Sequence, residues 1–418
     1  MSLQDEVLRV AQATHAAARE AASLPMKTKE KILVAMARAL RNARASLQKE
    51  NEKDLELGKA SGLSSAMLDR LTLSDKVIDQ TAAGLEEIAA FPDPVGEIVR
   101  MWTRPNGMRV GRMRIPLGVV GIIYESRPNV TADAAALCLK AGNAVILRGG
   151  SEASHSNAAI VALFKTVLSD HSISSDVINM LPTTDREAIL FMLKLEDLID
   201  LIIPRGGEQL IRFVAENSRI PVIKHYKGVC HLYVDAAADL DMAAELTFNS
   251  KVQRPGVCNS LETLLVHRAV ASEFLPLASE KLVAAGVELR GCEQSRAVVP
   301  SMKPATEDDW YAEYLDLILA VKVVENIDDA ISHIAKYGSL HTESIVTCDY
   351  EASQKFLKEV NSSSVIVNAS TRMSDGYVYG LGAEIGISTT KLHAFGPMGV
   401  EDLTTTKFIV LGDGQIRE

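Results

Sequence analysis

From residue 117 onward, short apolar runs alternate with longer stretches in which apolar positions recur every three or four residues. LGVVGIIY (117–124) is a continuous β-branched run, and TADAAALCLKAG (131–142) has the period of a helix. The pattern repeats as far as residue 224, with predicted strands at 144–148, 177–181, 198–204 and 221–224 and predicted helices at 152–168, 186–195 and 207–217. Apolar strands that alternate with helices are buried on both faces, so this region predicts a parallel, doubly wound α/β sheet. Such sheets bind ligands at the carboxyl ends of their strands.

A second alternation of the same kind begins after about residue 230. Its predicted strands are 261–267, 315–324, 344–347 and 363–369, and its predicted helices lie at about 269–285, 327–337 and 350–360. A chain of 418 residues exceeds the size at which one hydrophobic core usually stops growing. We therefore expect two doubly wound α/β domains.

The segments outside these two regions have other patterns. Residues 3–91 are Ala-rich and helical in period, with caps predicted at Thr28, Ser64 and Ser74. Residues 100–115 form two extended arms around an Asn-Gly pair, which is a strong hairpin signal. LTTTKFIVLG (403–412) predicts an edge or tail strand. Because neither the hairpin nor this strand has an evident partner within the chain, we expect a homodimer or tetramer.

Composition narrows the class of protein. Hydrophobic residues make up 47% and charged residues 23%, and the net charge is −10 with no basic tract, so nucleic acid is not expected as a partner. No apolar run reaches the roughly 18 residues that a membrane span needs, and the first residues lack the pattern of a signal peptide. The five cysteines are odd in number and scattered. They do not resemble a disulfide framework, which indicates a reduced, cytoplasmic protein.

Two predicted strand ends carry an Arg-Gly-Gly loop that leads into a helix. The first loop has Arg148, Gly149 and Gly150, with Ser151 as the helix cap; the second has Arg205, Gly206 and Gly207. Bare backbone at a helix start beside a cation suits a phosphate. Either loop alone can equally be an ordinary β–α turn. A Rossmann fingerprint is missing, because the nearest match, GLGAEIG (380–386), has the wrong spacing.

Cys258 has two interpretations: a small buried hydrophobe at a strand start, or a nucleophile. Lys251 and Arg254 lie just upstream, and cations lower a thiol pKa, while Gly256 permits a close backbone approach. Asn129, after the first long strand, can supply an oxyanion donor or can simply cap the next helix.

HYKGVCH (225–231) offers His225, Cys230 and His231 as possible metal ligands. No second cluster completes the set, so we expect no metal.

Five motifs in this order carry a family resemblance: YESRPNVTAD, ILRGGSEASHSN, PRGGEQLI, GVCNSLETLLV and YGSLHTESIVT. Together with VENIDDAISHIAKYGSLHTESI (324–345), the chain resembles the gamma-glutamyl phosphate reductase family of the aldehyde dehydrogenase superfamily. One departure is Leu340, where many members have a second histidine.

The resemblance implies an aldehyde dehydrogenase-like α/β fold with a small β oligomerisation element. Residues 1–99 and 116–232 are then the NADP-binding domain, and residues 233–372 are the catalytic domain. Residues 100–115 and 396–418 serve oligomerisation, and 373–395 return to the cofactor domain.

The resemblance also implies roles for single residues. Cys258 is the catalytic thiol and Asn129 the oxyanion-hole amide. Arg148 stands at or near a lysine that holds the adenosine ribose, followed by Ser151 and Glu152, and an arginine there suits the 2′-phosphate of NADPH. Glu313 corresponds to a glutamate on the nicotinamide ribose.

Hydrolytic aldehyde dehydrogenases have a glutamate that activates water, and here His225 stands near that position. The implied reaction is therefore NADPH-dependent reduction of L-glutamate 5-phosphate to L-glutamate 5-semialdehyde through a Cys258 thioester, in proline biosynthesis. Glutamate 5-kinase is the implied supplier of the substrate.

The candidates for binding the phosphate of the substrate are Arg127, Lys251 and Arg254, and Arg372 in loop 368–376 is the candidate for binding its amino-acid end. Two rivals stay open: another acyl-phosphate or aldehyde-oxidising member of the superfamily, and a catalytically silent nucleotide-binding protein.

Overall fold

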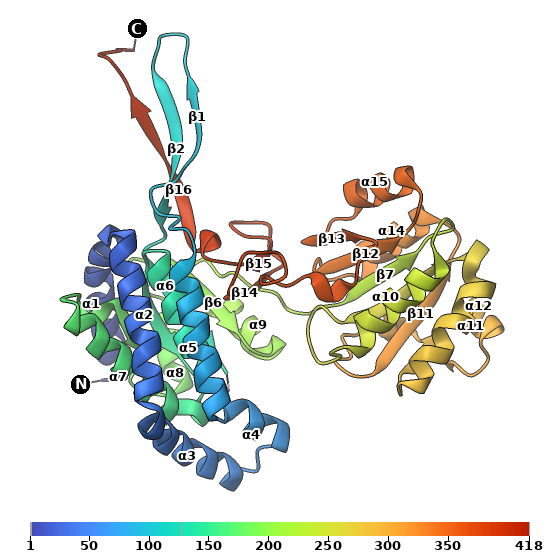
Figure 1. The fold of residues 1–418 in the computed structure, drawn as a ribbon, viewed down its shortest axis with the longest axis horizontal. Helices are drawn as coiled ribbons and strands as arrows, with labels where there is room; N and C mark the ends of the chain where they lie inside the picture. Colours follow the sequence, from blue (N-terminus) through green and yellow to red (C-terminus); the bar gives the residue numbers. More distant parts are fainter. Residues whose placement is uncertain (1, 126, 418) are drawn as a thin grey trace. The chain divides into compact units, whose positions relative to one another are not determined.

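A computed structural model describes residues 2–125 and 127–417 of the chain. The chain divides into two compact units (Figure 1). The first unit comprises Met1–Lys224, Leu381–Gly386 and Met398–Glu418, and the second comprises His225–Gly380 and Ile387–Pro397. The division falls after residue 224 rather than after 232, because the strand that begins at Cys230 pairs with strands of the second unit.

The first unit contains the predicted parallel sheet. Its strands are β3 (Val119–Tyr124), β4 (Ala144–Arg148), β5 (Ile178–Met180) and β6 (Leu201–Arg205), in the order β5-β4-β3-β6. The helices between and after them are α6 (Pro128–Lys140), α7 (Ser154–Asp170), α8 (Arg186–Met192) and α9 (Glu208–Asn217). The predicted strand at 221–224 is wrong: this segment makes one bridge, between Val222 and Ile202, and leaves the sheet.

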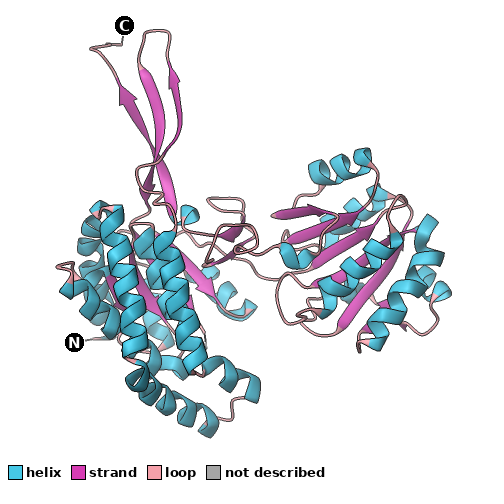
Figure 2. Ribbon diagram, viewed as in Figure 1, coloured by secondary structure: helices cyan, strands magenta, loops and turns pink. Residues whose placement is uncertain are grey.

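Five helices precede this sheet: α1 (Leu3–Ser23), α2 (Met26–Asn42), α3 (Arg44–Ala60), α4 (Ser65–Leu71) and α5 (Asp75–Ala90). Figure 2 draws them as helices, and they do not form a single layer: α1 packs against β4 and α8, whereas α2 and α5 pack against α7 and α6. The caps predicted at Ser64 and Ser74 are confirmed, since their hydroxyls accept from the backbone N–H groups of Met67 and Val77. Thr28 is not a cap, because α2 already begins at Met26, after Pro25.

The predicted hairpin and C-terminal strand form one antiparallel sheet. Among the described residues, β1 (Ile98–Thr103), β2 (Arg109–Pro116) and β16 (Thr404–Leu411) have the order β1-β2-β16, and this sheet extends away from the helices of its unit (Figure 1). The expectation that β16 has no partner within the chain is therefore wrong, because β2 pairs with it over its whole length. Trp102 and Phe408 meet edge to face across this sheet. Two edges, β1 and β16, remain.

Seven strands form the sheet in the described part of the second unit. They are β7 (Cys230–Val234), β8 (Leu261–His267), β9 (Glu288–Gly291), β10 (Lys303–Pro304), β11 (Ile318–Val324), β12 (Thr342–Val346) and β13 (Ser364–Val367). Their order is β10-β9-β11-β8-β7-β12-β13, and every neighbouring pair is parallel. The helices are α10 (Leu240–Val252), α11 (Arg268–Ala284), α12 (Glu293–Val298), α13 (Glu307–Trp310), α14 (Ile327–Tyr337) and α15 (Tyr350–Glu359). A short pair, β14 (Gly386–Ser388) and β15 (Gly396–Met398), follows.

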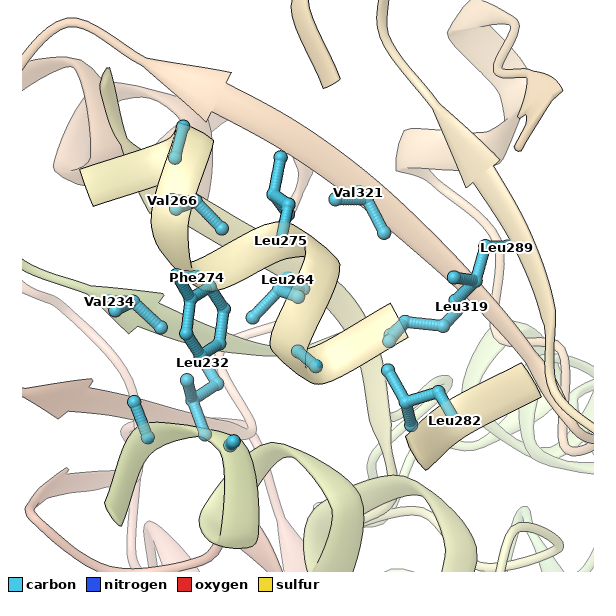
Figure 3. Packing of buried hydrophobic residues seen from close by; sticks show 14 of the residues in the cluster. Leu232, Val234, Leu264, Val266, Phe274, Leu275, Leu282, Leu289, Leu319 and Val321 are labelled. Carbon is cyan, nitrogen blue, oxygen red and sulfur yellow. The ribbon is translucent and has the colours of Figure 1, made fainter. Parts of the chain in front are cut away.

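A hydrophobic core holds helix α11 against this sheet (Figure 3). Phe274 and Leu275 of α11 are buried against strand residues such as Leu232 of β7 and Leu264 of β8. Burial of a large apolar side chain contributes about 1.5–3 kcal/mol. The central strands β7 and β8 are therefore firmly anchored, and both begin next to the Cys258 loop.

No helix in the described part of the chain is long and apolar enough to cross a membrane.

Candidate active site

Cys258 lies in the turn between α10 and β8, just before the amino end of β8. Ser260 N–H donates to Val257 O at 3.0 Å, so Cys258 and Asn259 are the two central residues of a tight turn. The amino ends of β7 and β12, at Cys230 and Thr342, are at the same edge of the parallel sheet. The thiol therefore lies at the edge formed by the amino ends of the strands. Parallel sheets usually bind ligands at the other edge, formed by the carboxyl ends. Cys258 is half-buried, which leaves its sulfur within reach of a substrate.

One side of the Cys258 turn rests on the segment before β7. A Cβ placed on Gly228 would lie 1.9 Å from Cys258 O and 2.8 Å from its Cα, so only glycine fits there. Gly256, by contrast, has its nearest neighbour, Leu315 O, at 3.7 Å from such a Cβ. The close backbone approach expected at Gly256 is therefore found at Gly228 instead. Gly228 N–H donates to Glu313 Oε1 at 2.9 Å, which holds this segment in place.

The other side of the turn rests on the loop that was expected to hold the amino-acid end of the substrate. Asn259 Nδ2 donates to Ser374 O at 2.8 Å, and Thr371 Oγ1 donates to Asn259 O at 2.8 Å. Asn259 is buried, and its Oδ1 has no hydrogen-bond partner among the described residues. Loop 368–376 and the nucleophile candidate are thus parts of one structure within the second unit.

Lys251 does not face the site. Its ammonium forms an ion pair of 2.8 Å with Glu262, and both side chains are completely buried. Burial lowers the pKa of Lys251 and raises that of Glu262 to about 7. A fully buried lysine cannot contact a substrate, so Lys251 is removed from the substrate-binding set and braces α10 against β8 instead.

Two of the predicted substrate-binding cations, Arg254 and Arg372, lie near Cys258. Arg254 is exposed, and Arg372 is half-buried and donates from Nε to Gln253 Oε1 at 2.9 Å. The pKa of Arg372 is lowered by burial and by the neighbouring charge of Arg254, while Asp375 and Cys258 act in the opposite direction. Two guanidinium groups that repel each other beside a thiol are suited to an anion, whose charge relieves the repulsion.

Asn129 is on the first turn of α6 in the first unit. The helix begins at Pro128 with Arg127, which is exposed, at the N-cap position, so Asn129 does not cap it. Its Nδ2 donates instead to Asp133 Oδ2 at 3.4 Å. Burial raises the pKa of Asp133 to about 6, against the charge of Arg205 and this hydrogen bond. The capping interpretation is therefore wrong, and the oxyanion interpretation of Asn129 stays a prediction. Ser126, in the same motif, lies outside the described residues.

The first Arg-Gly-Gly loop lies at the carboxyl end of β4. A Cβ on Gly149 would lie 2.1 Å from Asn157 Nδ2, and a Cβ on Gly150 would lie 2.2 Å from the Glu152 carboxylate. Arg148 is 8% exposed and donates from Nη2 to Thr184 O at 2.7 Å, while its Nε is buried and has no partner among the described residues. Arg148, Gly149, Gly150 and Asn157 line a small pocket. The predicted cap Ser151 is wrong, because the short helix Ser151–Ala153 has Gly150 at its N-cap position, and Ser151 is exposed. Bare backbone beside a half-satisfied guanidinium fits a phosphorylated ribose.

The second loop, at the end of β6, is largely committed to contacts within the chain. Arg205 Nη1 donates to Ile385 O at 2.8 Å, and Gly207 N–H donates to Glu125 Oε2 at 3.1 Å. A Cβ on Gly206 would lie 2.6 Å from the same carboxylate oxygen. The Glu125 carboxylate therefore already accepts the hydrogen bond of the Gly207 N–H, the group predicted to bind a phosphate.

The three possible metal ligands of HYKGVCH make separate contacts. His231 Nδ1 is 2.8 Å from Glu343 Oε2 in the core, and Cys230 Sγ is 3.2 Å from Cys258 O. His225 contacts the ring of His341, with 6.0 Å between the ring centroids. Among the described residues no group of three such side chains is placed to hold a metal.

Sequence reasoning missed the contacts of Gly228 and Cys230. The only signal was their spacing in G-x-C directly before an apolar strand, and that spacing does not show which loop lies opposite.

Comparison with known proteins adds the family. The sequence model of the aldehyde dehydrogenase family matches residues 2–290. Proteins named gamma-glutamyl phosphate reductase from Geotalea daltonii and Geobacter metallireducens are 60% and 61% identical to this chain, and each match covers 100% of this chain and 100% of the relative. The crystal structure of the enzyme of that name from Thermotoga maritima is 46% identical, with a TM-score of 0.97, and the match covers 99% of this chain and 100% of that one.

A glyceraldehyde-3-phosphate dehydrogenase from Methanocaldococcus jannaschii has the same fold at 16% identity, with a TM-score of 0.68, and 98% and 95% of the two chains are covered. The expected aldehyde dehydrogenase-like α/β fold is thus confirmed. The family resemblance of the motifs is confirmed as well, by relatives that match over the whole chain. The chain belongs to the aldehyde dehydrogenase family and, within it, to the gamma-glutamyl phosphate reductases.

Proposed function

We propose that this chain reduces L-glutamate 5-phosphate to L-glutamate 5-semialdehyde and phosphate, with NADPH as the reductant, in L-proline biosynthesis. The relatives that match over the whole chain carry the name of this enzyme. The observation that carries the proposal is the half-buried thiol of Cys258 beside Arg254 and Arg372. A thiol next to an anion site is what an acyl phosphate requires.

The chemistry starts at Cys258. Its thiolate attacks the acyl carbon, the oxyanion is stabilised by Asn129 and the Cys258 N–H, and the bond to phosphate breaks with its electron pair on oxygen. Arg254 and Arg127 are assigned to the departing phosphate and Arg372 to the amino-acid end. When bound, the nicotinamide cofactor supplies the hydride that reduces the thioester. Cys258 is regenerated as a thiolate because the C–S bond breaks with its electrons on sulfur.

Membership of the aldehyde dehydrogenase family implies a pyridine nucleotide. Arg148, Gly149, Gly150, Ser151 and Glu152 would hold its ribose and phosphates, and the unpartnered Nε of Arg148 supports this assignment. An arginine at this point favours the 2′-phosphate of NADPH over NADH.

Two further assignments of the cofactor site follow from the family. Arg205, Gly206 and Gly207 are kept as a secondary contact, although Glu125 and Ile385 already bind this loop. Glu313 is assigned to the nicotinamide ribose.

The proposal includes the absence of a water-activating base. His225 is near the position at which hydrolytic members of the superfamily have a glutamate. Without that carboxylate, water attack on the Cys258 thioester is slow and the acyl group survives until it is reduced. Reduction is therefore favoured over hydrolysis.

A cofactor assay in the reverse direction tests the proposal. With glutamate semialdehyde, the enzyme is expected to reduce NADP⁺ only when phosphate is present, and Cys258→Ala is expected to abolish turnover while NADPH binding persists. Reduction without phosphate would indicate the rival, an aldehyde-oxidising member of the superfamily. NADPH binding without turnover under any condition would indicate a silent nucleotide-binding protein.

The proposal extends to assembly and location. The exposed edges of β1 and β16 are suited to pairing with another copy, which supports a homo-oligomer. All five cysteines are free thiols, which supports a reducing cytoplasm. Because an acyl phosphate is labile, glutamate 5-kinase is the proposed functional partner. Light scattering of the purified chain tests the oligomer: a monomer would refute that part.

A further inference from the structure

Cys230 lies next to the nucleophile and has no role in the proposed chemistry. It is the first residue of β7 and completely buried. Its thiol donates to Cys258 O at 3.2 Å, and on its other side lies His341 Nδ1 at 3.7 Å. A thiol is normally a weak donor, so a contact this short is a specific hydrogen bond rather than incidental packing.

The accepting carbonyl belongs to the central peptide of the turn. Val257 O accepts from Ser260 N–H at 3.0 Å, so the peptide between Cys258 and Asn259 is the one whose flip interconverts type I and type II turns. A flip would exchange the positions of the Cys258 carbonyl and the Asn259 N–H beside the reacting sulfur. In the observed orientation the Cys258 carbonyl points toward the segment before β7. Gly228 has no side chain to block it, and the thiol of Cys230 donates a hydrogen bond to its oxygen.

We infer that Cys230 is a positioning residue, which holds the central peptide of the nucleophile turn in one orientation through its S–H···O bond to Cys258. The inference rests on the proposed role of Cys258 as nucleophile. Cys230 acts through Cys258 and does not touch the substrate itself.

The protonation state of Cys230 is consistent with a role as hydrogen-bond donor. Burial raises the pKa of Cys230 well above its usual value, and the charges of Glu343 and Cys258 raise it further. Cys230 therefore stays an S–H donor at neutral pH. A thiolate in its place would be unable to donate and would repel the thiolate of Cys258. His341 adds no charge here, because burial lowers its pKa to about 3, and its Nδ1 lies closer to Thr342 Oγ1, at 2.8 Å, than to Cys230 Sγ, at 3.7 Å.

A pair of substitutions separates positioning from packing. Cys230→Ala and Cys230→Ser remove similar volume, but only serine keeps a donor. A neutral hydrogen bond shifts an equilibrium by roughly two- to twelve-fold. We expect Cys230→Ala to lower kcat about ten-fold with KM changed less than about two-fold, and Cys230→Ser to recover kcat to within about three-fold of the wild type. Cys138 is the matched control, because it is also a completely buried cysteine but belongs to α6 of the first unit; Cys138→Ala is expected to keep the wild-type kcat.

Alkylation by iodoacetamide, followed by peptide mass spectrometry, is the second measurement. Cys258 in Cys230→Ala is expected to react at a rate within about two-fold of the wild type, since the substitution removes no charge, and the buried Cys230 of the wild type is expected to stay unmodified. Equal kcat values for Cys230→Ala and Cys230→Ser, or a wild-type kcat for Cys230→Ala, would overturn the inference. If Cys258→Ala retained turnover, the proposed function itself would fail, so the two failures are distinguishable.

Discussion

Gly228→Ala is the substitution whose effect the structure determines most directly. The added Cβ would lie 1.9 Å from Cys258 O, 2.6 Å from its carbonyl carbon and 2.8 Å from its Cα. All three are backbone atoms, so no side chain can rotate away to make room. The contact to the oxygen has to lengthen by at least 1.1 Å to reach the 3.0 Å below which real Cβ contacts are essentially not found.

That displacement falls on the residue that carries the nucleophile. A misplacement of about 1 Å in reacting geometry costs about 10²-fold in rate. We therefore expect kcat of Gly228→Ala to fall roughly 100-fold, while the strain of an overfilled site lowers stability by only about 1–3 kcal/mol. Steady-state rates of NADP⁺ reduction with semialdehyde and phosphate measure the first effect, and urea denaturation measures the second.

Gly256→Ala is the matched control for Gly228→Ala. Gly256 lies in the loop that carries Cys258, two residues before it, but the nearest atom to a Cβ added at Gly256 would be 3.7 Å away. This variant is expected to keep kcat within about two-fold of the wild type. The reasoning would be refuted if Gly228→Ala folded normally and retained more than a third of the wild-type kcat, or if both glycine variants lost activity equally.

Three other predictions concern charge. Lys251→Met should lower the free energy of unfolding by about 3–5 kcal/mol, because it leaves Glu262 buried without its partner. The double variant Lys251→Met, Glu262→Leu should recover most of that loss. Urea denaturation measures both, and no recovery in the double variant would show that the ion pair is not the cause. Asp133 has a folded-state pKa of about 6, above its ordinary value of 3.8, so the protonated form is favoured by folding and its contribution to stability is lost as pH rises from about 4 to 6. Melting curves of Asp133→Asn should therefore show a smaller decline over this pH range than the wild type, and identical slopes would disprove the assignment. Arg148→Ala should weaken NADPH binding at least about ten-fold but NADH binding much less, as measured by nucleotide fluorescence, whereas equal losses would mean that Arg148 only supports the loop around Thr184.

Apolar periodicity predicted the strands that are fully buried. β3 is a wholly apolar run and β4 is apolar up to Arg148, and both lie where the pattern placed them. β8 also lies at its predicted place, although Glu262 and Thr263 interrupt its apolar run near its start. β7 was missed because it begins with Cys230 and His231, and the carboxylate that bonds His231 N and Nδ1 is that of Glu343 in β12, which is distant in the sequence.

For the candidate active site, the sequence predicts which residues take part but not what they contact. The assignment of Cys258 as the nucleophile and of Arg372 to the substrate stays a prediction, and the structure adds that the loop of Arg372 packs against Asn259. Lys251 was misassigned because nearness in sequence does not show burial, and the side chain of a residue near the end of a helix can turn into the core. The same limit explains β16, whose pairing with β2 joins segments almost 300 residues apart.

Cys258 is proposed to carry the acyl group as a thioester until it is reduced, and trapping that thioester tests the proposal. The enzyme is supplied with L-glutamate 5-phosphate, generated in place by a kinase and ATP, in the absence of NADPH; the chain is then digested at low pH and its peptides are analysed by mass spectrometry. We expect a γ-glutamyl adduct on the peptide that contains Cys258, which disappears on addition of NADPH and does not form in Cys258→Ala. An adduct on another residue, or turnover by Cys258→Ala, would contradict the proposal.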